Sequence, residues 1–357
     1  MRETNLFGKE CDRMPSQPVH DQSYQAVSRI GYIDFLKVIG LAGIVAAHTG
    51  PPGWVIMLRC FDVPLMVILS AMLGERAYSR RLEAGKSLQG YYLSRAKRLV
   101  FPTWVFLAFY FLIRFLAGGE ARSFRYYAAS FLLTQYGIKY VWVILIYLYS
   151  ALMIPFFCRF GQKRWIWAGV AAAYALYELA YHLKIGTDSK LLMSTFYDFV
   201  PYAVGLTYLG FLANRQSRQK HLWVAAGALA VFAGMAVYYR LTQGAFQSVQ
   251  NAKYPARLYY LSYGVGCSFA LLFFCETVRL RLYESRLVRF ISSHSLWLYL
   301  WHIFVLDVYS LLRFPDNWVI KWLTVFTVSV LIVYLINLGL DAVEKRKQLK
   351  WLWLLRG

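Results

Sequence analysis

Long, uncharged apolar runs recur along this chain, and they constrain its fold more than any other feature. Of its 357 residues, 59% are hydrophobic and 16% are charged, whereas about 25% of the residues of an average soluble domain are charged. Many runs reach the length of about 18 residues that a helix needs to cross a bilayer. They are continuous rather than alternating, so they predict transmembrane helices and not barrel strands. We expect an all-α, polytopic membrane bundle.

About ten transmembrane helices are predicted, in a single domain. They are expected at residues 33–48, 54–73, 99–116, 141–157, 165–183, 194–212, 222–239, 258–276, 290–312 and 318–340. The apolar piece 124–133 is too short to cross and is expected to lie at the interface or to re-enter. The transmembrane domain is predicted over residues 30–341. A polar segment, 1–29, precedes it, and a basic tail, 342–357, follows it.

Positive charge gathers in alternate short loops. The net charge is +21, and Lys and Arg concentrate within 76–98, 159–164, 215–220, 279–289 and the tail. Loops of this kind remain on the cytoplasmic side, so both termini of this multi-pass protein are predicted there. A basic chain can also indicate nucleic-acid binding, but the positions beside predicted spans favour topology, and no nucleic acid is expected. The five cysteines form no CxxC pair, so neither a zinc site nor any other metal site is predicted.

The first predicted span carries three ionisable residues, Asp34, Lys37 and His48. Such groups cost several kcal/mol inside hydrocarbon and usually mark a functional path. Lys37 and His48 are eleven residues apart, so they lie within ~20° on one helix face and ~16 Å apart along the axis. This separation suits two ends of one long ligand or two stations along a path. Asp34 and Lys37 can also pair simply to let the helix insert.

Two histidines are candidates for chemistry. A neutral imidazole at His48 can take a proton from a hydroxyl near neutral pH, as acyl transfer to an alcohol requires. The alternative is a hydrogen bond from His48 to a neighbouring helix. His302 falls near the middle of its predicted span, where we expect it to line a pocket; the alternative is a buried interhelical bond.

The second predicted span contains Arg59, Asp62, Pro64 and Ser70. Arg59 and Asp62 are three residues apart and are expected to neutralise one another. Pro64 removes a backbone donor and is expected to kink the span. Broken membrane helices often line cavities, which makes Ser70 a candidate lining residue.

A pair of arginines precedes the third predicted span. Arg95 and Arg98 share one helical side at its cytoplasmic entrance. Topological anchoring accounts for them, and phosphate binding remains equally open because guanidinium groups suit phosphates.

Taken in order, these motifs resemble membrane acyltransferase family 3, the polytopic enzymes that O-acylate cell-surface sugars. The resemblance runs from about residue 29 to 340. It rests on Ile33-Asp-Phe-Leu-Lys37 with His48, on Val63-Pro-Leu-Met-Val-Ile-Leu-Ser-Ala71, on Arg95 to Arg98 before Pro102, on the Trp142 segment, and on Ser295-Leu-Trp-Leu-Tyr-Leu-Trp-His302. Many members have arginine at the position of Lys37, aromatic residues at those of Met66 and Val67, and glycine at that of Ala71.

The resemblance implies a multi-pass O-acyltransferase of a bacterial inner membrane, most often an O-acetyltransferase. Its donor would be acyl-CoA, usually acetyl-CoA, and its acceptor a hydroxyl of a surface glycan or lipid-linked saccharide at the membrane. Catalytic roles are predicted for His48, His302 and Asp34. Donor-binding roles are predicted for Lys37, Arg59, Ser70, Arg95 and Arg98. Direct transfer and an acyl relay through His48 both remain open.

Two other classes of function are open from sequence alone. A proton-coupled transporter or flippase of a polysaccharide precursor could use Lys37, Glu178 and Asp198, because intramembrane acids often relay protons. A non-catalytic scaffold of a polysaccharide assembly is the third. Turnover of labelled acetyl-CoA by purified protein separates the enzyme from both.

Overall fold

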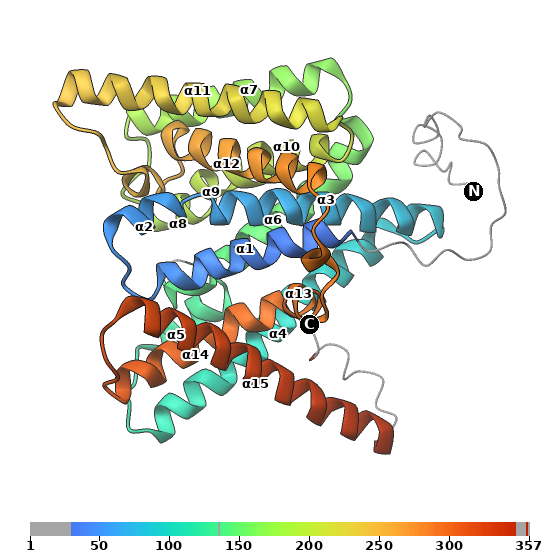
Figure 1. Ribbon diagram of the computed structural model, residues 1–357, viewed down its shortest axis with the longest axis vertical. Coiled ribbons are helices and arrows are strands. Elements are labelled where there is room, and N and C mark those ends of the chain that lie inside the picture. The colour runs from blue at the N-terminus through green and yellow to red at the C-terminus, as the bar shows by residue number, and fades with distance from the viewer. Residues whose placement is uncertain (1–29, 135, 348–354, 356–357) are drawn as a thin grey trace.

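The computed structural model describes residues 30–134, 136–347 and 355. The elements in this part of the chain are helices that lie side by side (Figure 1). They are α1 (Gly31–Ala47), α2 (Gly53–Leu58), α3 (Asp62–Glu83), α4 (Leu88–Leu116), α5 (Phe124–Phe131), η1 (Lys139–Val141), α6 (Trp142–Phe160), α7 (Arg164–His182), α8 (Lys190–Ser194), α9 (Phe196–Asp198), η2 (Phe199–Leu206), α10 (Thr207–Ala213), α11 (Arg218–Gln243), η3 (Val249–Ala252), α12 (Leu258–Thr277), η4 (Arg281–Glu284), α13 (Arg286–Ser293), α14 (Ser295–Leu311) and α15 (Trp318–Lys347). The predicted all-α membrane fold is confirmed.

Six helices in the described residues are long and apolar enough to cross a membrane. They are Gly53–Glu83, Leu88–Leu116, Lys139–Phe160, Arg218–Gln243, Leu258–Thr277 and Trp318–Glu344. Each of the ten expected spans falls on helical segments, but the number ten remains a prediction. The predicted segment 1–29 and the tail beyond residue 347 lie outside the described residues, apart from residue 355.

Helix α1 lies in the middle of the bundle, against α3 on one side and against α13, α14 and α15 on the other (Figure 1). Two glycines let α3 approach it closely. A Cβ at Gly40 would meet the Met66 side chain at 2.7 Å, and one at Gly43 would meet Asp62 Cβ at 3.2 Å. Residues on α1 therefore face several other helices at once.

The second predicted span is interrupted, but not by a kink at its proline. Pro64 lies in the first turn of α3, where its missing N–H has no helical partner to lose. The break lies just before it, where α2 ends at Leu58 and α3 begins at Asp62. An interruption of this span was expected at the proline, and the structure has it just before Pro64. Pro64 instead packs on Gly264 of α12, where an added Cβ would meet its ring at 2.5 Å.

Close helix packing at Ala71 comes from the partner helix. A Cβ at Gly210 of α10 would lie 2.6 Å from both Ala71 Cβ and the Ile68 carbonyl oxygen. The small residue that permits this approach thus stands on α10 and not on α3.

The ninth predicted span is also broken, into α13 and α14 at His294. The Ser285 side chain caps α13 by accepting from the Val288 N–H at 3.1 Å, as helix N-caps do. Contacts from α1 reach Ser292 on α13 and then His302 on α14. The two helical segments therefore run alongside α1 in the same direction.

Candidate active site

Two histidines from distant parts of the chain meet at the end of α1. His48 follows the last residue of α1, and its Nδ1 lies 2.9 Å from Nε2 of His302 on α14. The rings are stacked, with centroids 5.1 Å apart and planes 12° from parallel. His302 is fully buried, whereas His48 is only partly buried. His48 is thus the more accessible member of the pair.

The hydrogen bonds define which nitrogen of each ring carries a proton. His302 Nδ1 contacts the carbonyl oxygen of Tyr299, which can only accept, so this nitrogen must donate. In a neutral His302 the Nε2 atom is then unprotonated and accepts from His48 Nδ1–H. His48 Nε2 is left with its lone pair. The chain from Tyr299 through His302 to His48 therefore prepares one nitrogen to take a proton.

Tyrosines complete the surroundings of the pair. The Tyr140 ring, in η1, meets His48 edge-on at a centroid distance of 4.8 Å. The Tyr299 hydroxyl donates to the Tyr140 carbonyl, which ties α14 to η1. Neither tyrosine was among the predicted site residues. The position of Tyr299, three residues before His302 on one helix, was a usable signal for it, because i and i+3 are neighbours.

Asp34 and Lys37 lie at the opposite end of α1, on Ser292 of α13. The Ser292 hydroxyl donates to Asp34 Oδ1 at 2.5 Å, and Lys37 Nζ donates to the Ser292 carbonyl at 2.5 Å. Asp34 precedes His48 by fourteen residues, or ~21 Å of helix rise. The structure therefore does not bring Asp34 to the histidines. Its contacts instead fix α1 against α13.

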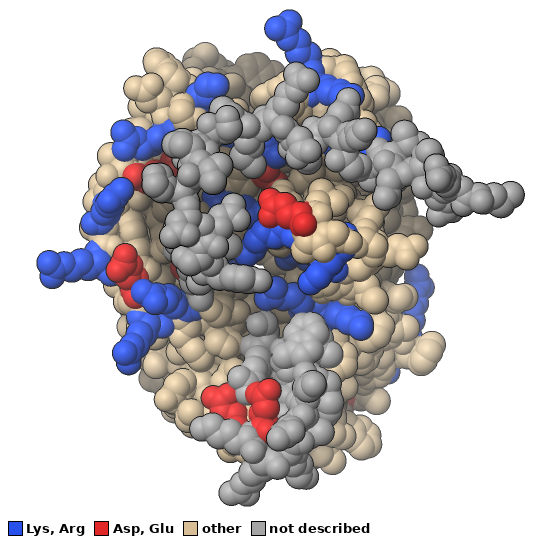
Figure 2. All heavy atoms as spheres, turned by 90° about the vertical axis from the view of Figure 1, so that its right-hand side faces the viewer, with Lys and Arg blue, Asp and Glu red and all other residues tan. Residues whose placement is uncertain are grey.

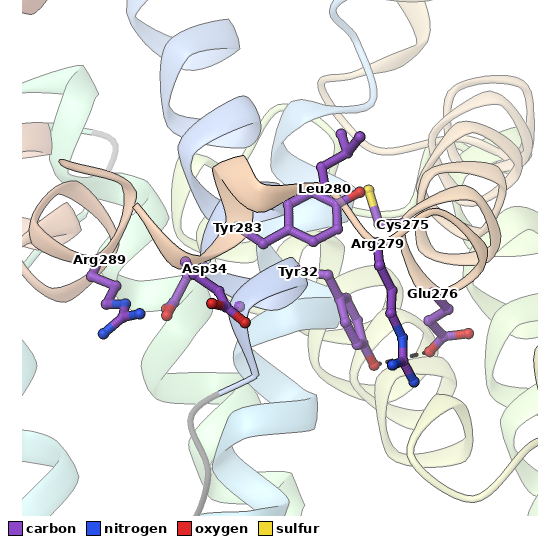
Figure 3. A pocket seen from close by; sticks show the side chains of 10 residues that line it. Tyr32, Asp34, Cys275, Glu276, Arg279, Leu280, Tyr283 and Arg289 are labelled. Carbon is purple, nitrogen blue, oxygen red and sulfur yellow. Dashed lines mark hydrogen bonds between the residues drawn. The ribbon is translucent and has the colours of Figure 1, made fainter. Parts of the chain in front are cut away.

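A large cavity of about 670 Å³ opens beside the beginning of α1 (Figure 3). Asp34 and Tyr32 line it, together with Glu276, Arg279 and Arg289. The Tyr32 hydroxyl donates to Glu276 Oε1 at 3.0 Å. The lining is therefore mixed in charge, and two of its carboxylates, Asp34 and Glu276, already accept hydrogen bonds.

A second cavity, of about 320 Å³, lies between the end of α3 and the start of α4. Its lining includes five cations, Arg80, Arg81, Lys86, Arg95 and Arg98. We call this the basic cavity. Figure 2 looks onto this end of the molecule, where Lys and Arg side chains gather.

A buried donor accompanies the cations of the basic cavity. Arg81 Nε is buried and has no hydrogen-bond partner within the described part of the chain. A buried donor left unpaired costs about 1–3 kcal/mol. Phosphate oxygens would satisfy such donors and balance the cations. The structure thus brings the predicted residues Arg95 and Arg98 together with three further cations.

The basic cavity lies at α3 and α4, and α4 contacts α14, the helix of His302, further along its length. The Phe106 ring on α4 meets Trp301, next to His302, at a centroid distance of 6.0 Å. Arg98 precedes Phe106 by eight residues, or ~12 Å of helix rise. A ligand bound in the cavity would need to extend about 12 Å along α4 to reach the level of Phe106 and Trp301.

Arg59 and Ser70, both predicted to bind the acyl donor, lie in different parts of the structure. Arg59 caps the end of α2, at the histidine end of the molecule, so it is not brought to the basic cavity. Ser70 lies on α3, one turn before Gly74, and a Cβ at Gly74 would be 3.8 Å from the Tyr91 hydroxyl. Residues four apart share a helix face. Ser70 therefore lies on the same face as Gly74, one turn further from the basic cavity.

Glu178, an acid of the transporter hypothesis, and Glu276, a further acid at the end of α12, are engaged in separate contacts. Glu178 pairs with Arg257 at 2.7 Å and accepts from the Leu258 N–H at 3.0 Å, joining α7 to α12. Glu276 accepts from Tyr32 and contacts His221 Nδ1 at 2.8 Å. These contacts join pairs of helices.

The comparisons with known proteins agree with this arrangement. A family model described as an acyltransferase domain matches residues 30–338, nearly the whole chain. No curated protein and no solved structure gives a significant match. With most of its length matched and with long apolar helices in the bundle, this chain belongs to acyltransferase family 3 and is a membrane acyltransferase.

Proposed function

We propose that the protein is an O-acyltransferase, with His48 as its general base. It moves an acyl group, most often acetyl, from cytoplasmic acyl-CoA to a hydroxyl of an extracytoplasmic glycan or lipid-linked saccharide. The observation that carries this proposal is the hydrogen-bonded pair of His48 and His302, in which the partly buried member keeps a basic nitrogen.

The donor side of the proposal rests on the basic cavity. We assign the end with this cavity to the cytoplasm of a bacterial inner membrane, because Lys and Arg gather there. Arg95, Arg98 and their neighbours bind the phosphates of the nucleotide. The pantetheine arm then extends toward the histidines, a rise of ~12 Å along α4. Lys37 supports this path indirectly, by fixing α1 to α13 at Ser292.

The chemistry balances without any other group. His48 Nε2 takes the proton of the acceptor hydroxyl as the oxygen attacks the thioester carbonyl. The C–S bond breaks, and the proton passes from His48 to the leaving thiolate. While His48 is charged, its Nδ1–H bond to His302 and the Tyr299 carbonyl behind it stabilise the imidazolium. No covalent acyl-enzyme is needed in this scheme.

Purified protein with labelled acetyl-CoA and a glycan extract tests the proposal. Wild type transfers label to glycan, and His48→Ala lowers transfer to background while leaving the protein folded in the membrane. His294→Ala serves as the matched control, because its ring contacts the Phe290 carbonyl and lies away from the pair. Transfer by His48→Ala at the wild-type rate would contradict the mechanism. Transport of an unmodified saccharide without acetyl-CoA would favour the transporter.

A further inference from the structure

A buried group of charged side chains lies at the histidine end, outside the chemistry proposed above. We call Arg59, Asp62, Gln250 and Lys253 the outer cluster. Arg59 and Asp62 flank the break between α2 and α3, while Gln250 and Lys253 belong to η3 and the residue after it. Two segments that are 191 residues apart in the chain thus meet here.

Every oxygen of the one carboxylate in the outer cluster is already used. Arg59 Nη1 donates to Asp62 Oδ2 at 2.6 Å, and the Val63 N–H donates to Asp62 Oδ1 at 2.7 Å. Arg59 Nη2 donates to Gln250 Oε1 at 3.2 Å. The predicted neutralisation of Arg59 by Asp62 is therefore confirmed.

Two cationic donors of the outer cluster remain unused. Arg59 Nε is buried and has no hydrogen-bond partner in the described ranges. Lys253 is only 4% exposed, and among the described residues its ammonium forms no ion pair or hydrogen bond; it lies 5.4 Å from the ring centre of Tyr254. Two cations and one carboxylate leave a net single positive charge. An uncompensated buried charge costs several kcal/mol, so the outer cluster is suited to receive one anion.

The outer cluster adjoins the histidine pair. Asp62 packs on α1 at Gly43, which precedes His48 by five residues or ~7.5 Å of rise. Tyr254, next to Lys253, contacts Trp142 at a centroid distance of 5.3 Å. Trp142 follows η1, which carries the Tyr140 ring that meets His48.

We propose that the outer cluster binds an anionic group of the acceptor, a carboxylate or a phosphate, beside the hydroxyl that is acylated. Arg59 Nε and Lys253 Nζ donate to the anion, and its charge balances the cluster. The acceptor is therefore an acidic or phosphorylated saccharide. This inference rests on the proposed acyl transfer, because it concerns the acceptor of that reaction.

Binding of simple sugars to the full chain in lipid nanodiscs tests the inference. Glucuronate, glucose 1-phosphate and glucose are compared at constant ionic strength by the rise in unfolding temperature. We expect one or both anionic sugars, and not glucose, to stabilise the wild type. Lys253→Met is expected to weaken that binding by about tenfold or more, since a hydrogen bond to a charged group contributes that much. Lys184→Met, at an exposed lysine outside the cluster, is the matched control and keeps the effect.

The three sugars and the Lys253 variants distinguish the possible results. Stabilisation by glucuronate alone identifies a carboxylate, and by glucose 1-phosphate alone a phosphate. An equal effect of glucose, no effect of either anionic sugar, or an undiminished effect in Lys253→Met overturns the inference. If Lys253→Met does not fold, Lys253→Gln takes its place. Acetyl-CoA turnover is measured on the same samples: turnover without anion binding contradicts this inference alone, and anion binding without turnover contradicts the proposed function.

Discussion

His48 and His302, 254 residues apart in the chain, share a hydrogen bond of 2.9 Å between Nδ1 and Nε2. The second nitrogen of His302 is held by the Tyr299 carbonyl. A base whose partner is itself anchored keeps one tautomer and one orientation. The pair therefore acts as a unit in which His302 positions the nitrogen that His48 presents.

The first prediction concerns this positioning role. His302→Phe keeps the volume and the stacking on His48 but removes the acceptor for His48 Nδ1–H. We expect kcat to fall on the order of 10²- to 10⁴-fold, the usual contribution of a positioned base, while KM for acetyl-CoA changes little. Steady-state kinetics measure both constants. His302→Gln, whose side-chain oxygen can accept from His48, is expected to recover part of kcat; equal loss in both variants would indicate a purely structural role.

The sequence identifies both histidines of this site but not the contact between them. Charges in an apolar helix made Asp34, Lys37 and His48 visible from the sequence alone, because hydrocarbon excludes them. The pairing of His48 with His302 was not predictable, since nothing in one helix indicates which face of another it meets. For the same reason Asp34 was grouped with the catalytic residues, although it contacts Ser292 at the other end of α1.

The burial of Lys253 is a second feature that could not be predicted from the sequence. In the sequence it lies in a short loop between two predicted spans, like a few other isolated cations. Its burial depends on how η3 packs against the break between α2 and α3, through the bond from Arg59 to Gln250. Loop residues are placed by the elements around them, so their function becomes apparent only in the fold.

The second prediction concerns donor binding in the basic cavity. Arg98→Gln is expected to weaken acetyl-CoA binding by about tenfold, because charge-assisted bonds to phosphate contribute ~1.5–3 kcal/mol. Equilibrium binding of labelled acetyl-CoA measures this. Arg289→Gln, in the mixed-charge cavity beside α1, is the comparison and should bind normally. The opposite ranking of the two variants would place the nucleotide in that cavity instead.

The third prediction tests the packing between α3 and α10. Gly210→Ala is expected to lower stability by ~1–3 kcal/mol, as overpacking does, because the new Cβ would meet backbone at 2.6 Å. Gly227→Ala on α11 is the matched control, since a Cβ there meets nothing within 4 Å. The control should be neutral or gain ~0.4–1 kcal/mol. Thermal unfolding in detergent compares them, and equal melting temperatures would contradict the packing.

The fourth prediction is a pH dependence at the outer cluster. Burial lowers the pKa of Lys253 below its ordinary 10.5, partly opposed by Asp62 and reinforced by Arg59. Anion binding needs the charged ammonium, so it is full below the lowered pKa and is lost as pH rises through it. Stability of the protein without ligand changes in the opposite sense. Between the lowered and the ordinary pKa the unfolded chain binds more protons, so stability rises with pH.

Melting curves with and without the anionic sugar that binds, recorded from neutral pH upward, measure both effects. Lys253→Arg keeps its charge at high pH, so it should bind the anion across the whole range. Lys253→Met should lose both pH effects together. A loss of binding with the same midpoint in wild type and Lys253→Arg would assign the titration to another group of the site, such as the neighbouring Cys60, whose charge also acts on Lys253.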